Sequence, residues 1–296
     1  MNGEAGHAPG PTGTLVNGLA ADRISALDRS VQYGDGLFET VAVCAGRPLL
    51  WDRHVERLRS GCLRLGIEAP GEAELLADIE CLCRGFGRTV IKIIVTRGCA
   101  GRGYAPPRPA SPTRIVIAWP WPDYPAHNAG RGVAVRWCHT PASVNPAMAG
   151  IKHLNRLEQV LARAEWDREY AEGLMCDPDG FVVEGTMSNV FAVSGGTLMT
   201  PDLSCSGVAG VMRAEVIAAA RRLGLCCEEV RITAAGLEGM DEIFLTNSII
   251  GLWPVTTLAT RGYAIGQVTQ AVRGAIREVQ CFDTSTAGPD ELRTID

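Results

Sequence analysis

The sequence predicts an α/β protein with two lobes, and three observations lead to that prediction. The chain of 296 residues exceeds the usual size of one domain. Apolar, β-branched runs alternate with helical stripes along its length. A proline-rich stretch over 120–130 separates these elements into two groups, because proline is poorly tolerated inside helices and inner strands. We expect a small α+β lobe over 14–119, a linker over 120–130 and a larger mixed α/β lobe over 131–280.

Hydrophobic spacing gives the elements of the first lobe. One helix is predicted over 51–66 because Val55, Leu58, Cys62 and Leu65 follow helical spacing. Runs rich in valine and isoleucine predict strands. In chain order we expect strands at 14–20 and 37–46, helices at 51–66 and 72–83, and strands at 89–98 and 113–119.

The second lobe is predicted in the same way. A long amphipathic helix is expected over 153–173, with an apolar face made of Leu154, Leu157, Val160, Leu161 and Ala164. The turn residues 177–180 separate two apolar runs and predict a β-hairpin. The remaining expected elements are strands at 132–138, 188–196 and 241–248 and a helix at 211–224.

Both ends of the chain are predicted to lie outside the fold. Residues 1–13 have neither the basic segment nor the apolar segment of a secretory signal and are interpreted as a disordered leader. Residues 281–296 are interpreted as a polar, frayed tail. The 11 cysteines form an odd set without a Cys-x-x-Cys pair, which indicates reduced thiols and a cytoplasmic protein.

Composition and motifs exclude several classes of function. The net charge of -5 and the lack of a basic cluster argue against a nucleic-acid partner. No apolar run reaches the roughly 18 residues that a membrane span needs. The cysteine spacing does not suit zinc, so no metal is expected. The sequence also lacks the Walker A motif of nucleotide-binding proteins, the H-E-x-x-H motif of metalloproteases and the G-x-S-x-G nucleophile elbow.

The segment 149–158, AGIKHLNRLE, is the most informative part of the chain. Lys152 stands where a loop rich in proline and glycine meets a predicted helix. A lysine that is partly buried at such a junction loses its proton readily, which suits it to Schiff-base chemistry. Most lysines are solvated surface charges, and on this residue alone that alternative stays open.

Other residues supply what a pyridoxal phosphate site needs, namely an anion at the ring nitrogen and a cradle for the phosphate. Glu184 ends an apolar strand, where a carboxylate needs a partner. The glycine-bearing segment 207–213 leads into a helix start, a place where phosphate binds. Arg57 offers a bidentate guanidinium, and Asn247, beside Thr246 and Ser248, offers a side-chain donor. Each of these features alone is also common on ordinary surfaces and turns.

The loop TRGCAGRGY, residues 96–104, is the other unusual stretch. Its glycine order is G-x-x-G-x-G, and no strand–loop–helix context follows, so it does not indicate a dinucleotide site. We interpret it as a flexible loop that presents Arg102 and Tyr104 to substrate carboxylates.

Taken together, these motifs resemble those of the fold-type IV pyridoxal-phosphate enzymes. That family includes branched-chain aminotransferases, D-amino-acid aminotransferases and aminodeoxychorismate lyases. The resemblance extends from about Val16 to about Val268. It is carried by the segments DRSVQYGDGLFET, HVERL, TRG, the lysine loop, EGTMSNVF, GVMR and LTNS.

Within the family, AGIKHLNRLEQVLAR and RGCAGRGY are more similar to the lyases. Phe38 stands where the aminotransferases have a tyrosine of their carboxylate trap. The resemblance therefore implies a lyase that eliminates pyruvate from 4-amino-4-deoxychorismate and yields 4-aminobenzoate for folate biosynthesis. A D-amino-acid or branched-chain aminotransferase is the alternative on the same fold. A binding or scaffold protein without cofactor is the alternative outside it.

The resemblance also implies roles for single residues. Lys152 corresponds to the catalytic Schiff-base lysine, and Glu184 to the partner of the ring nitrogen. The residues at phosphate-holding positions are Arg57, Val211, Met212 and Asn247, and those at substrate-binding positions are Phe38, Arg102 and Tyr104. Family members are typically homodimers. The sequence leaves open whether His153 and Asn155 touch substrate, and we expect Asn155 to cap the following helix.

Overall fold

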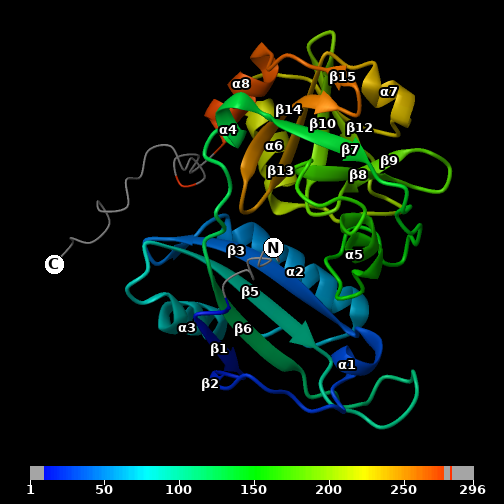
Figure 1. Cartoon of the computed structure of the whole chain (residues 1–296). Helices are drawn as coiled ribbons and strands as arrows, with labels where there is room; N and C mark the ends of the chain where they lie inside the picture. The colour runs from blue at the N-terminus through cyan, green and yellow to red at the C-terminus, as the bar shows by residue number, and fades with distance from the viewer. Residues whose placement is uncertain (1–9, 277–280, 282–296) are drawn as a thin grey trace, which may run out of the picture. The chain divides into compact units, whose positions relative to one another are not determined.

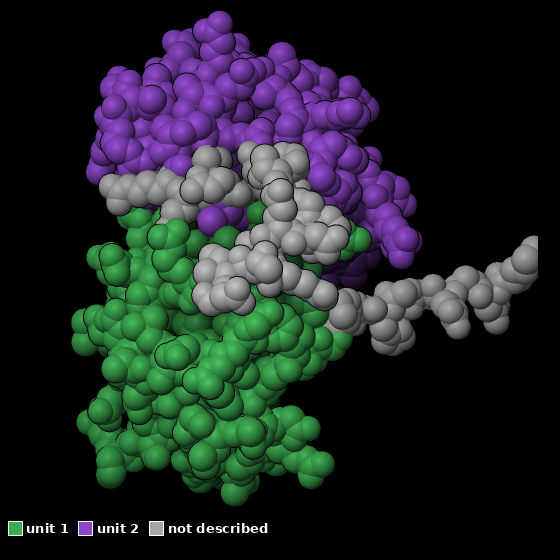
Figure 2. Space-filling model, turned by 90° about the vertical axis from the view of Figure 1, so that its left-hand side faces the viewer, with its two compact units in different colours: residues 1–123 green, residues 124–296 purple. Residues whose placement is uncertain are grey.

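The computed structural model describes residues 10–276 and Cys281. The chain forms two compact units, residues 1–123 and 124–296, which Figure 2 shows in different colours and which are described separately below. The boundary between the units falls within the stretch 120–130 that its prolines predict as a linker. Most of the predicted leader and tail lies outside the described residues, whereas Gly13, assigned to the leader, begins the first strand.

A six-stranded antiparallel sheet forms the first unit (Figure 1). Its strand order is β2-β1-β6-β5-β3-β4. The elements are β1 (Gly13–Val16), β2 (Leu19–Ala20), α1 (Arg29–Tyr33), β3 (Gly36–Cys44), β4 (Arg47–Pro48), α2 (Trp51–Leu65), α3 (Glu72–Cys83), β5 (Arg88–Thr96) and β6 (Thr113–Pro120). The predicted strand at 14–20 is in fact the hairpin β1–β2, because Asn17 and Gly18 turn the chain with positive φ.

One face of this sheet is buried because apolar side chains alternate along its central strands. Leu37 and Val41 of β3 lie on the same face as Ile91 and Ile93 of β5, and all four are almost completely buried. Helix α2 covers β3 closely, since a Cβ atom on Gly61 would lie 3.0 Å from the side chain of Leu37. The predicted helices are confirmed. The other face of the sheet carries both buried residues, such as Ala42 and Val90, and half-buried ones, such as Phe38.

The second unit is built on a mixed sheet of nine strands. The strands follow the order β12-β11-β10-β13-β14-β7-β8-β9, and β15 pairs with β14. The strands are β7 (Val133–Trp137), β8 (Glu172–Cys176), β9 (Val182–Gly185), β10 (Asn189–Ser194), β11 (Thr197–Pro201), β12 (Cys227–Val230), β13 (Glu242–Asn247), β14 (Gly251–Leu258) and β15 (Arg261–Gly262). The helices are α4 (Asn128–Arg131), α5 (Leu157–Arg163), α6 (Val211–Arg222), α7 (Ala234–Glu238) and α8 (Gln267–Ala275).

The core of this unit lies around the central strands. Phe191 of β10 and Phe244 of β13 are opposite each other in the register, and their rings stack at 5.1 Å between centroids. The predicted hairpin is confirmed, with β8 and β9 antiparallel on either side of the turn at Asp177–Gly180. Within residues 10–276, no helix has both the length and the apolar character of a membrane span.

The predicted long helix over 153–173 is wrong. Helix α5 has only 7 residues, and the chain leaves it before Trp166, whose indole N–H donates to the carbonyl of Tyr170 at 3.0 Å. Residues 172–176 pair with β7 and β9 instead, so sheet pairing overrides the helical pattern. The predicted core face is also wrong, because Leu157, Val160 and Leu161 are 71%, 61% and 55% exposed. The N-cap is Arg156 rather than Asn155.

A pair of glycines in the first unit tests the packing at the end of β5. Gly98 and Gly85 both have positive φ, but only at Gly98 would a Cβ atom clash, at 1.8 Å from the carbonyl oxygen of Ser111. We expect Gly85→Ala to lower the free energy of unfolding by about 1 kcal/mol. Gly98→Ala should cost at least about 2 kcal/mol more in chemical denaturation. Equal losses would contradict the close contact with Ser111.

Candidate active site

The loop before Lys152 is hydrogen-bonded to the glycine-rich segment before α6. The Gly150 N–H donates to the carbonyl of Gly207 at 2.9 Å, and the Ala209 N–H donates to the carbonyl of Gly150 at 3.0 Å. These two bonds pair the lysine loop with the segment that the sequence predicts as a phosphate cradle. The Lys152 side chain is half-buried, as expected for a lysine used in chemistry.

Arg156 fixes the backbone on both sides of Lys152. Its Nε donates to the carbonyl of His153 at 2.9 Å, and its Nη2 donates to the carbonyl of Ile151 at 3.3 Å. The guanidinium therefore grips the carbonyls of the residues immediately before and after the lysine. The sequence does not indicate this role, because both contacts are to backbone carbonyls whose positions depend on the fold.

Glu184 is one of the buried carboxylates of the second unit. It is 6% exposed, and its Oε2 accepts the Val208 N–H at 2.9 Å and the Asn189 amide at 3.3 Å. The Asn189 amide also donates to the carbonyl of Val208 at 2.9 Å. Within the described part of the chain, the other carboxylate oxygen, Oε1, accepts no hydrogen bond. One oxygen is thus held in place while the other is available to a ligand.

Two glycines let the backbone approach this carboxylate. A Cβ atom on Gly207 would lie 2.8 Å from the side chain of Val183 and 3.3 Å from Oε2 of Glu184. A Cβ atom on Gly210 would lie 2.0 Å from Oδ1 of Asn189. Any side chain at these positions would fill the space beside Glu184.

Burial raises the pKa of Glu184 to about 7, against the opposing effects of the Val208 N–H and of the positive charges on Arg156 and Lys152. A carboxylate in such a place is stabilised as an anion when a cationic group binds beside it. The protonated ring nitrogen of pyridoxal phosphate is a group of this kind. The geometry and charge of Glu184 therefore fit the predicted cofactor.

His153 carries a buried nitrogen beside the lysine. Its Nδ1 has no hydrogen-bond partner among the described residues. Burial, assisted by the charges of Arg156 and Lys152, lowers the pKa of His153 to about 4. The imidazole is therefore neutral near pH 7 and adds no charge at Lys152.

In the first unit, Arg57 of α2 is fixed by a buried carboxylate. Its Nε donates to Oε1 of Glu39 at 2.8 Å, and its Nη2 donates to Oε2 at 2.5 Å. The Nδ1 atom of His54 lies 2.6 Å from Oε2 of Glu39. Burial acts to raise the pKa of Glu39, but Arg57 and His54 lower it to about 2. The sequence singled out Arg57 but gave Glu39 no part in orienting it.

The predicted substrate residues also belong to the first unit. Phe38 is half-buried, and the Nζ of Lys92 lies 5.0 Å from its ring centroid. Burial lowers the pKa of Lys92. Arg102 and Tyr104 are exposed in the loop over 97–112, and the Tyr104 ring packs against Tyr33 at 5.4 Å.

The remaining predicted cofactor residues lie in the second unit. Val211 and Met212 form the first turn of α6, which no side chain caps. Asn247 has the turn-forming role that the sequence left open as its alternative, because its Oδ1 accepts the N–H groups of Ile249 and Ile250 at 2.8 and 2.9 Å. Its amide donates to the carbonyl of Met187 at 3.1 Å. Phosphate binding by Asn247 stays a prediction.

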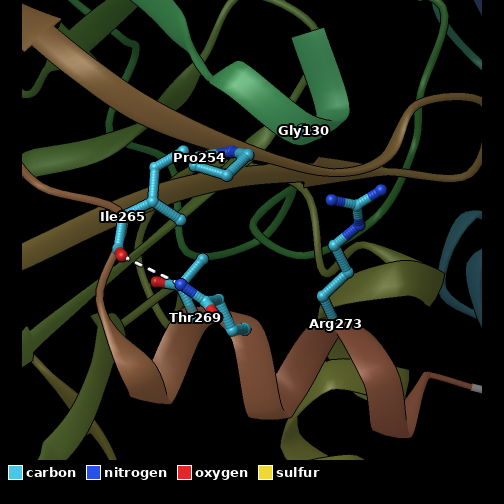
Figure 3. A pocket seen from close by; sticks show the side chains of 6 residues that line it. Gly130, Pro254, Ile265, Thr269 and Arg273 are labelled. Atoms are coloured by element: carbon cyan, nitrogen blue, oxygen red, sulfur yellow. Dashed lines mark hydrogen bonds between the residues drawn. The ribbon is translucent and has the colours of Figure 1, made fainter. Parts of the chain in front are cut away.

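A separate pocket of about 360 Å³ lies beside α8 in the second unit (Figure 3). It is lined by Gly130, Pro254, Ile265, Thr269, Gln270 and Arg273. None of the predicted site residues lines it. In the part of the chain that the structure describes, no group of acidic, histidine or cysteine side chains could hold a metal ion.

Residues 36–258 match the Amino-transferase class IV family. The chain belongs to this family. The matched span covers both units and contains all the predicted site residues, from Phe38 to Asn247. The predicted fold class is confirmed.

Individual relatives are similar over nearly the whole chain. An aminodeoxychorismate lyase of Vibrio harveyi is 35% identical over 264 residues, which cover 88% of this chain and 97% of that protein. The crystal structure of 4-amino-4-deoxychorismate lyase from Pseudomonas aeruginosa has a TM-score of 0.85 and 47% identity, covering 89% of this chain and 98% of the other. A putative branched-chain aminotransferase of Methanocaldococcus jannaschii is 31% identical over 279 residues, covering 90% of this chain and 95% of that protein.

The pKa of Glu184 leads to a pH dependence that can be measured. Its value of about 7 exceeds the ordinary 4.5, so the folded protein without cofactor binds more protons than the unfolded chain between these values. Glu184 should therefore make stability fall by about 3 kcal/mol as pH rises through this window.

We expect the difference in unfolding free energy between wild type and Glu184→Gln to show that fall in urea titrations at stepped pH. The opposite contribution of His153, whose pKa is lowered, cancels in the difference. A difference that does not change with pH would contradict the buried, uncompensated state of Glu184.

Proposed function

We propose that the protein is an aminodeoxychorismate lyase that uses pyridoxal 5'-phosphate. The observation that carries the proposal is that two proteins of that name, at 35% and 47% identity, match this chain over almost all of their own length. The reaction converts 4-amino-4-deoxychorismate to 4-aminobenzoate and pyruvate. Its atoms balance without water, oxidant or reductant, so it needs only proton transfers and bond cleavage.

The residues around Glu184 in the second unit fit the cofactor. Lys152 would hold it covalently, and Oε1 of Glu184 would accept a hydrogen bond from the protonated ring nitrogen. The backbone at Val211 and Met212, together with Arg57 and Asn247, would hold the phosphate. Support comes from the buried Glu184 and from the glycines that keep side chains away from it.

The chemistry that pyridoxal phosphate supplies is an electron sink for the pair released when a proton leaves the amine-bearing carbon. Lys152, with its Nζ as a neutral amine, takes that proton and later returns a proton to the products. Arg156 keeps Nζ in one position because it holds the carbonyls on both sides of the lysine. Glu184 holds a proton at the ring nitrogen and so keeps the sink positive.

The substrate carries two carboxylates, which a cationic loop can bind. Arg102 is the proposed partner of one of them, and Tyr104 and Phe38 are the proposed contacts of the ring. A guanidinium pairs with a carboxylate through two parallel hydrogen bonds, which fixes orientation as well as charge.

An aminotransferase is the second candidate, favoured by the 31% identity to the putative branched-chain enzyme and by a D-alanine aminotransferase of Bacillus licheniformis at 29% identity. Both candidates share the removal of the first proton by the lysine. They differ in whether a leaving group is then expelled, so the products distinguish them.

We also propose a homodimer in the cytoplasm. Among the described residues, which include all eleven cysteines, none forms a disulfide, which supports a reducing compartment. The exposed apolar side chains Leu157, Val160 and Leu161 of α5 support a further protein contact.

The first test uses the fact that Lys92 and Lys152 are the only lysines in the sequence. Borohydride reduction of the loaded protein should place the cofactor on Lys152 alone, and Lys92→Arg should keep that label. Lys152→Ala should lose the label, the absorbance of the bound cofactor and the formation of 4-aminobenzoate with equimolar pyruvate. Transfer of the amino group to a keto acid, with no 4-aminobenzoate formed, would favour the aminotransferase.

A second test concerns the substrate carboxylate. Arg102→Leu should raise the KM for aminodeoxychorismate by about tenfold or more, because a charge-assisted hydrogen bond is lost. The absorbance of the bound cofactor should not change, since Arg102 is not among its proposed ligands. An unchanged KM in steady-state assays would remove Arg102 from this role.

A further inference from the structure

A short segment of the first unit, residues 28–35 with helix α1, contacts the loop over 97–112 at both its base and its tip. We propose that this segment is a clamp that positions Arg102 for the substrate carboxylate. The part of the inference that concerns the substrate rests on the proposed function. The part that concerns the loop rests on the contacts within this unit alone.

Asp28 closes the base of the loop. It is 1% exposed, and its Oδ2 accepts the hydroxyls of Thr96 at 2.9 Å and Thr113 at 2.8 Å. Thr96 ends β5 and Thr113 begins β6, so one carboxylate oxygen joins the two ends of the loop. The other oxygen, Oδ1, accepts the N–H of Ser30 at 2.9 Å and so starts α1.

Arg29 and Tyr33 hold the tip of the loop. Nη1 of Arg29 donates to the carbonyl of Gly103 at 2.9 Å, and Nη2 donates to the carbonyl of Tyr104 at 3.1 Å. The hydroxyl of Tyr33 accepts the N–H of Gly103 at 3.2 Å. Gly103 follows Arg102 directly, so these three bonds fix the backbone from which the Arg102 side chain projects.

The clamp is itself anchored to the core of the unit through Asp35. Oδ2 of Asp35 accepts the Nε of Arg29 and the Nε of Arg97, each at 2.7 Å. Arg97 also donates to the carbonyls of Leu65 and Gly66 at the end of α2, at 2.8 and 2.9 Å. Burial acts to raise the pKa of Asp35, but the two arginines lower it, so the charged cluster persists at neutral pH.

The exposed side chain of Arg102 stands on a backbone that is held by buried residues, and this combination indicates that the clamp positions Arg102. Arg102 is exposed and Tyr104 is 84% exposed, whereas Arg29 and Arg97 are 4% and 7% exposed. A loop held only by its own contacts would have to be ordered when substrate binds, at a cost in affinity. Because the clamp orders the backbone beforehand, its loss should appear in KM more than in kcat.

Trypsin cleavage after Arg102 reports directly on the clamp, because a protease needs a locally mobile backbone. In the full-length protein, Arg29→Gln should speed this cleavage about tenfold, the effect of losing charge-assisted hydrogen bonds to the loop. Tyr33→Phe, which removes only one hydroxyl acceptor, should speed it about threefold. The site of cleavage is identified by mass spectrometry.

Arg114→Gln is the matched control. Arg114 pairs with Asp78 at 2.8 Å and Glu74 at 3.1 Å in the same unit, and its side chain is 14% exposed. This variant loses a part-buried ion pair without removing a contact of the clamp, so its cleavage after Arg102 should match that of wild type. Cleavage that is equally fast in the three variants would overturn the clamp, because general destabilisation would then explain it.

The enzymatic arm tests the part that concerns the substrate. Arg29→Gln and Tyr33→Phe should raise the KM for aminodeoxychorismate, with kcat within about twofold of wild type and the absorbance of the bound cofactor unchanged. Faster cleavage with an unchanged KM would overturn the role in substrate binding. A wild-type protein without lyase activity would refute the proposed function, and the cleavage rates would still decide whether the clamp exists.

Discussion

The buried carboxylate of Glu184 is the constraint around which the second unit is arranged. It lies on β9, where burial opposes its charge, and a single backbone N–H and the Asn189 amide hold one of its oxygens. These contacts require the segment at 207–210 to pass close to Glu184 and Asn189. Only glycine fits at positions 207 and 210, because a Cβ atom there would clash with neighbouring side chains. The same segment is paired with Gly150, so the position of Lys152 depends on the neighbourhood of Glu184.

Two buried carboxylates, Glu39 of the first unit and Glu184 of the second, differ in how their negative charge is compensated. Glu39 is compensated within the protein, since Arg57 and His54 surround it and keep it ionised. Glu184 has weaker internal compensation, and its pKa lies near neutrality. A buried group that lacks a counter-charge is costly to fold, and such groups occur where a ligand supplies what is missing. This contrast separates a carboxylate that orients a side chain, Glu39, from one that we propose as a ligand-binding group, Glu184.

The sequence predicted much of the fold because local signals agree there with tertiary packing, and it singled out Lys152 and Glu184, which the structure shows as half-buried and buried. The stripe of Val55, Leu58 and Cys62 predicts α2 correctly, since one face of that helix meets the sheet. The stripe of Leu157, Val160 and Leu161 fails because those side chains are exposed and the chain turns into β8. Glu39, Asn189 and Arg156 were missed as positioning residues because their partners depend on the folded backbone. No periodic pattern encodes such contacts.

Because Asp28 closes the base of the loop over 97–112, the proposed substrate contacts of this loop can change without a change in the sheet. Because Thr96 and Thr113 are tied to the same carboxylate, the distance between the loop ends is set by the sheet and by Asp28 rather than by the loop itself. The stretch between Thr96 and Thr113 can therefore vary independently of the spacing of the two strands. Its length and charge can change while the two strands that carry it stay as they are.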